Sequence, residues 1–128
     1  MTHPISSLIE SSHGAIYAYG VIAAYAPDST ALDDMATHRR MRDELITYAQ
    51  SNGIEIPSAA PAYQLPIPVR DNSTARAAAT AIENLMCATW AHAVAQLDSE
   101  FSSTHVQFPI DCAIRAYGYT QQFFAFPG

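Results

Sequence analysis

One pair of side chains in the sequence has the spacing of metal ligands. Glu10 and His13 are three positions apart, so on a helix they share a face and can point at one ion. Dimetal proteins built on four helices take one glutamate from each of two helices and a Glu-x-x-His pair from each of the other two. A complete set of this kind would indicate an iron or manganese oxidoreductase.

The rest of such a ligand set is missing from the sequence. Met35 stands three positions before His38, where a glutamate would be needed, and Ile114 stands three positions after Asp111, where a histidine would be needed. We therefore expect no cofactor, with iron or manganese as the alternative. The incomplete set of metal candidates consists of Glu10, His13 and Glu83.

Several polar side chains fall on the apolar faces of the expected helices and predict a polar layer across the interior. A buried carboxylate such as Glu83 needs a cation beside it, and the forked guanidinium of Arg115 suits it. One interpretation is a set of internal salt bridges and hydrogen bonds that replaces a metal site. The other is a small pocket for an anionic or hydrogen-bonding ligand of unknown identity. The layer consists of His13, Tyr17, His38, Arg42, Glu83 and Arg115.

The turns between helices set which residues lie at the same level. A turn at Pro27 places Tyr17 level with His38, and His13 level with Arg42. A turn near Ser99 places Glu83 level with Arg115 and Cys87 level with Cys112, provided that the last helix continues through Pro109. The layer has no Ser-His-Asp or Cys-His arrangement, so no residue is assigned as catalytic and an enzyme is not favoured.

Four helical segments must position these side chains. The first covers residues 5–25, and the second begins after Thr30, which has capping-box spacing to Asp33, and ends at Gly53. The third follows residues 71–73 and continues to about residue 97. The fourth lies between residues 99 and 122, where Pro109 either kinks it or begins it.

The connections predict the topology. A short turn makes the first two helices antiparallel neighbours, whereas residues 53–70 contain four prolines that favour an extended connection along the bundle. One long crossover between the second and third helices is the ferritin-like arrangement. The sequence therefore predicts an all-α, ferritin-like four-helix bundle with a Pro-rich crossover, forming a single domain over residues 1–128.

Charge and composition exclude several classes of protein. The chain has net charge −6 and no lysine, whereas a nucleic-acid binder needs a basic surface. The longest uncharged apolar stretch, residues 15–26, is shorter than the roughly 18 residues that cross a bilayer. No signal peptide is evident, so we expect a cytoplasmic protein, no membrane association, and reduced thiols at Cys87 and Cys112.

Several pieces of the chain, taken in order, match the pattern of a known family. They are residues 13–20, 38–43 and 62–69, Glu83, and residues 113–116 and 126–128. Together they resemble a bacterial family described only as a ferritin-like domain of unknown function. The family usually places a glutamate immediately before the first histidine of its pattern, and Ser12 stands there in this chain. The resemblance implies a ferritin-like bundle and no particular activity.

Three functions follow from these observations. The favoured one is a non-catalytic structural or interaction module that forms a homodimer, because the chain has few charges and an aromatic C-terminal segment with Phe123, Phe124 and Phe126. The alternatives are a small-molecule binding bundle that uses the polar layer and a divergent metal-dependent oxidoreductase.

Overall fold

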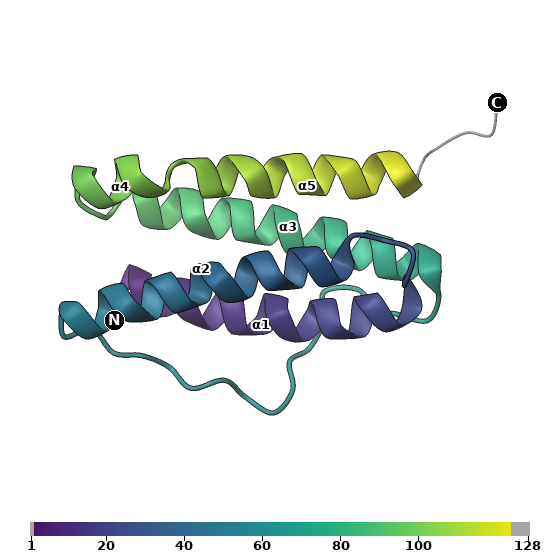
Figure 1. Ribbon diagram of the computed structural model, residues 1–128, viewed down its shortest axis with the longest axis horizontal. Coiled ribbons are helices and arrows are strands. Elements are labelled where there is room, and N and C mark those ends of the chain that lie inside the picture. Colours follow the sequence, from purple (N-terminus) through teal and green to yellow (C-terminus); the bar gives the residue numbers. More distant parts are fainter. Residues whose placement is uncertain (1, 124–128) are drawn as a thin grey trace.

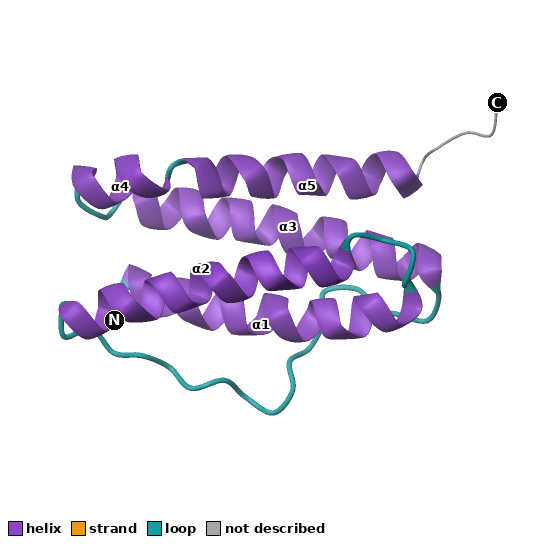
Figure 2. Ribbon diagram, in the orientation of Figure 1, coloured by secondary structure: helices purple, strands orange, loops and turns teal. Residues whose placement is uncertain are grey.

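The predicted four-helix bundle is present in the computed structural model. The structure describes residues 2–123, with side chains described up to Thr120, and this range contains helices, turns and loops without any strand. The fourth predicted helix is divided into two collinear parts (Figures 1 and 2). The helices are α1 (Pro4–Tyr25), α2 (Ala31–Ser51), α3 (Asn72–Val94), α4 (Ser99–His105) and α5 (Gln107–Phe123).

Two antiparallel hairpins make up the bundle. The first consists of α1 and α2, the second consists of α3 with α4 and α5, and α1 packs along α3 to join them. Residues 52–71 connect the hairpins without a helix and run along the length of the bundle, so α2 and α3 point in the same direction (Figure 1). Leu65 and Ile67 of this connection pack against the core.

The helix break near the C-terminal hairpin lies at Val106 rather than at Pro109. Pro109 is the third residue of α5, and proline is tolerated there because the first N–H groups of a helix have no intrahelical partner. The helix therefore resumes before the proline.

Local capping confirms one predicted helix start and corrects another. Asp71 accepts from the Thr74 backbone in a capping box at α3, as residues 71–73 predict. The predicted capping box of Thr30 and Asp33 is wrong, because Thr30 makes no capping bond to the α2 backbone. Its hydroxyl instead donates to the Asp34 carboxylate at 2.8 Å.

Small residues allow the two hairpins to approach closely. Ala75, Ala78 and Ala79 of α3 are fully buried, and the largest buried side chains are Trp90 and Tyr19. A helix face of alanines lets a neighbouring helix pack with few voids. This close contact places the middle of α3 at the centre of the bundle.

The outer face of α5 is apolar and exposed. Among the described side chains, Val106, Ile110, Ile114 and Tyr117 are 49%, 47%, 62% and 66% exposed. Over residues 2–123 no helix combines the length and hydropathy needed to pass through a lipid bilayer. The predicted burial of the aromatic segment at Phe124 and Phe126 falls outside the described residues.

Candidate functional site

Glu83, in the middle of α3, is the centre of a buried polar network. Its side chain is completely buried and receives donors from the three other long helices. The Tyr19 hydroxyl of α1 and the His38 Nε2 of α2 both bond to Oε2, the latter at 2.7 Å. Arg115 of α5 donates from Nε to Oε1 at 3.0 Å. Three helices thus each supply one donor to the carboxylate that the fourth helix, α3, provides.

These contacts keep Glu83 ionised. Burial alone would raise its pKa, but the hydrogen bond and Coulomb attraction from His38, followed by the charge of Arg115, outweigh burial and hold the pKa below the usual 4.5. Because an ionised carboxylate only accepts hydrogen bonds, the proton between His38 and Glu83 belongs to His38 Nε2. The same network raises the pKa of Tyr19, through burial and then the Glu83 charge.

The lowered pKa of Glu83 predicts that the fold is sensitive to acid. A carboxyl whose pKa is lower in the folded state stabilises the fold above its unfolded pKa, and this contribution is lost as the pH falls through the folded value. We expect the thermal unfolding midpoint to drop as the pH falls below 4.5, measured by circular dichroism at a series of pH values. Glu83→Gln should have a shallower acid dependence.

Asp28 and Asp71 provide an internal control for that measurement. Both are exposed carboxyls whose pKa is also lowered, each mainly by hydrogen bonds, and both remain in the Glu83→Gln chain. If that variant lost stability in acid as steeply as the parent chain, the acid sensitivity would come from such surface carboxyls and not from Glu83.

The side chain of Arg115 also reaches Cys112. Its terminal nitrogen lies 3.3 Å from the Cys112 sulfur, and burial raises the pKa of that thiol strongly. A thiol held protonated is a poor nucleophile. Cys112 and Cys87 are not joined by a disulfide in this structure, and Cys112 forms part of the buried wall of the network.

A second buried carboxylate, Asp34, lies beside the first network. Tyr119 of α5 donates to Asp34 Oδ2 at 2.6 Å, and its ring is 6.3 Å from the ring of Tyr19. Sequence reasoning missed Tyr19, Asp34 and Tyr119. A signal was present for two of them, because Asp34 precedes His38 by four residues and Tyr119 follows Arg115 by four, which places each pair on one helix face.

Three residues of the predicted polar layer lie elsewhere. His13 bonds through Nε2 to the Pro57 carbonyl in the connection, and the Tyr17 ring contacts the ring of Tyr63 at 6.0 Å. Arg42 pairs with its neighbour Asp43 at 3.2 Å on the surface. The predicted contact of Glu83 with Arg115 is present, His38 also bonds to Glu83, and Tyr19 occupies the place expected for Tyr17.

The metal candidates are not brought together. Glu10 is exposed on α1 and His13 faces the connection, whereas Glu83 lies at the bundle centre. Within the described part of the chain, no group of three or more His, Cys, Asp or Glu side chains is arranged to hold a metal ion. The side chains around Glu83 instead supply hydrogen-bond donors, and these hydrogen bonds connect the helices of the bundle.

Two buried nitrogens near this network have no partner. They are His38 Nδ1 and Trp90 Nε1, and both rings contact the ring of Phe108, at 5.7 and 5.0 Å between centroids. Each such group carries the cost of desolvation without a compensating hydrogen bond. Both oxygens of Glu83 therefore have hydrogen-bond donors, whereas the two ring nitrogens of His38 and Trp90 beside Phe108 have no partner.

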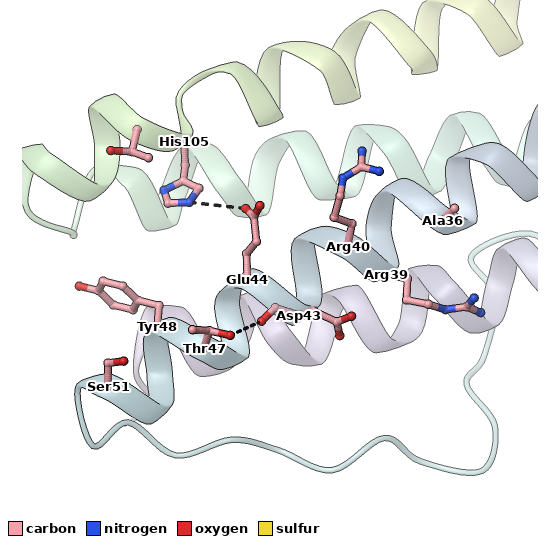
Figure 3. A pocket seen from close by; sticks show the side chains of 10 residues that line it. Ala36, Arg39, Arg40, Asp43, Glu44, Thr47, Tyr48, Ser51 and His105 are labelled. Carbon is pink, nitrogen blue, oxygen red and sulfur yellow. Dashed lines mark hydrogen bonds and ion pairs between the residues drawn. The ribbon is translucent and has the colours of Figure 1, made fainter.

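A surface hollow lies away from Glu83, between α2 and α4. It encloses about 840 Å³ and is lined mainly by α2, with Thr104 and His105 of α4 on the other side. In Figure 3 the Glu44 side chain points toward His105, with 4.0 Å between carboxylate and ring. His105 also stacks on Phe101, with 4.2 Å between ring centroids.

The comparisons with known proteins agree with this fold. The profile of a family described as "domain of unknown function (DUF4439)" matches residues 6–128. The crystal structure of a conserved hypothetical protein, rv2844, from Mycobacterium tuberculosis superimposes with a TM-score of 0.90 at 25% sequence identity, covering 98% of this chain and 91% of that chain. Comparison with curated proteins gives no match.

Proposed function

The chain belongs to the DUF4439 family, whose description names no activity, and from its geometry we propose that the protein is a non-catalytic, ferritin-like bundle that acts as a homodimeric interaction module. The ferritin-like part of the proposal is supported by the two hairpins and the long connection between α2 and α3. The interaction part is supported by the exposed face of α5.

The interior supports a structural role for the polar side chains. Glu83 and His38 are fully buried, and both carboxylate oxygens of Glu83 already accept donors from the protein. A ligand could reach Glu83 only by displacing these donors, which would leave a buried cation unpaired. The interpretation as a small-molecule pocket therefore has less support than the interpretation as a structural network that holds the four helices in register.

The observation that carries the proposal is the apolar face of α5. Contiguous exposed apolar patches on a soluble domain mark interaction sites more often than scattered single residues do. Four of the seven large apolar side chains that are exposed among the described residues lie in the twelve-residue stretch from Val106 to Tyr117. Such a patch favours a partner that removes it from water.

Solution mass and metal content test this proposal. Light scattering should give a mass that rises toward twice the 13.9 kDa of the chain as the concentration increases through the micromolar range, and elemental analysis after growth in metal-supplemented medium should give far less than one iron or manganese per chain. A monomer at all concentrations would contradict the dimer. A stoichiometric metal would contradict the non-catalytic assignment.

A further inference from the structure

Val106, the residue directly before α5, and the exposed apolar residues of α5 form one stripe. Val106, Ile110, Ile114 and Tyr117 follow one another at steps of four, four and three residues, so they lie on one face of the helix. The other large exposed apolar side chains of the described range, Tyr25, Leu32 and Leu85, lie singly on or beside other helices. We refer to the four residues as the α5 stripe.

The face that carries the α5 stripe has few charges. The charged residues of α5 are Asp111, which accepts from Gln107 at 2.9 Å, and Arg115, which is bonded to Glu83. Both are only partly exposed, whereas the exposed neighbours of the stripe are Gln107 and Ala113. The core of a protein interface is depleted of charge in the same way.

From these observations, and building on the proposed homodimer, we infer that the α5 stripe packs against the α5 stripe of a second copy in an antiparallel, two-fold pair. The steps of three and four residues are those of a helix that pairs with another helix carrying the same pattern. A second copy supplies that pattern, and a two-fold axis buries the same patch on both copies. Neither stripe then needs an oppositely charged partner.

The pattern also sets the register. In an antiparallel pair with Ile110 of one copy level with Ile114 of the other, the isoleucines face each other. Tyr117 then faces Gln107, and Val106 faces the small Gly118. Like positions of the two copies lie about 6 Å apart along the helix axis in this register, since four residues rise about 6 Å.

The size of the stripe predicts a weak dimer. The four side chains expose on the order of 400 Å², within the range typical of the largest apolar patch on a monomer. A stable interface buries about 800 Å² on each partner, and smaller ones are transient. Because each copy carries net charge −6, added salt screens their repulsion and should strengthen the pairing, whereas it would weaken pairing with a basic protein.

Two matched substitutions test the surface. Ile114→Glu places a charge in the centre of the interface and should weaken dimerisation about tenfold or more in sedimentation equilibrium. Leu85→Glu makes the same change at a comparably exposed position of α3 and should leave the dimer intact. Circular dichroism melts should show that both variants fold, since neither position is buried.

Cysteine cross-linking tests the register. In a Cys87→Ser background, an equimolar mixture of Ile110→Cys and Ile114→Cys chains should form covalent dimers on oxidation. Either chain alone should form few, because like positions are too far apart for a disulfide. Efficient cross-linking of each variant with itself would overturn the antiparallel register.

The outcomes separate this inference from the proposed function. A dimer that survives Ile114→Glu overturns the α5 pairing and leaves the homodimer standing, whereas a wild-type monomer overturns both. Dimerisation that appears only after removal of residues 124–128 would show that the chain's own C-terminal segment covers the α5 stripe, and this too would overturn the inference. Loss of dimerisation on adding salt would indicate a partner held by charge, contrary to the inference.

Discussion

Replacing Glu83 with glutamine is expected to lower the free energy of unfolding by about 3–5 kcal/mol, the usual cost of removing one member of a buried ion pair. The neutral amide cannot balance the charge of Arg115, which is only 17% exposed, and its NH₂ group faces donors where the carboxylate accepted them. For a chain of this length the thermal midpoint should fall by roughly 10–20 °C. Differential scanning calorimetry near neutral pH measures the change.

Glu10 provides the matched control for this substitution. It is an exposed glutamate on α1, so Glu10→Gln removes the same charge from the chain without disturbing a buried network. Its effect should remain within about 0.5 kcal/mol, as for most surface changes. Equal effects at the two positions would mean that net charge, and not the contacts of Glu83, determines the stability.

Replacing the whole network should be far less costly than breaking it. A chain with apolar residues of similar volume at Glu83, His38, Arg115 and Tyr19 leaves no unpaired charge, and such replacements are often neutral or stabilising by about 1–4 kcal/mol. If this chain is much more stable than the Glu83→Gln variant, the cost of the single substitution comes from the buried groups that it leaves without partners. A similar loss in both would show that the network contributes net stability.

Truncating Trp90 to alanine should also cost about 3–5 kcal/mol, because a fully buried indole leaves a cavity that the surroundings fill only in part. Trp90 stacks on Phe101 with ring planes 7° apart and lies 5.0 Å from Phe108. It therefore fixes the short helix α4 and the start of α5. Chemical denaturation should give the loss in stability, and hydrogen exchange should show it concentrated in α4.

Trp90→Phe tests the unpartnered nitrogen of the same side chain. Trp90 Nε1 is buried without a hydrogen-bond partner, so phenylalanine removes ring volume but no hydrogen bond. We expect a loss well below that of the alanine variant, about 1–2 kcal/mol. A loss as large as that of Trp90→Ala would indicate that the indole N–H makes a bond essential to the fold.

The sequence was sufficient to predict the helices and the partner of the central charge. Apolar periodicity and turn residues placed all four helical segments, and the need to neutralise a buried carboxylate paired Glu83 with Arg115. The rotation of each helix was not predictable in the same way. Tyr17 and Tyr19 are two positions apart and thus about 200° apart around α1, and only the packing of α1 against α3 decided which one faces Glu83.

Contacts with residues far away in the sequence explain most of the remaining differences between the prediction and the structure. His13 was expected in the polar layer, but the carbonyl of Pro57 lies beside it, and nothing in the local pattern shows where residues 52–71 pass. His105 follows Phe101 by four residues in α4, so helix spacing accounts for that contact, but its contact with Trp90 of α3 depends on how the helices pack. Residues near long connections and helix breaks are those for which periodicity carries the least information.

The long connection between α2 and α3 has a consequence for the order in which the chain folds. Contacts between α1 and α2, and between α3 and α5, are local in sequence and can form early, whereas contacts between the hairpins require residues 52–71 to close a loop. That delay is modest, because loop-closure entropy grows slowly with length. Tyr19 and His38 of the first hairpin reach Glu83 of the second only at this late docking step. A pair of hairpins docked in the wrong register would therefore bury the carboxylate with Arg115 as its donor and without the other two. The charge at the centre of the bundle thus acts against misfolded arrangements as well as within the native one.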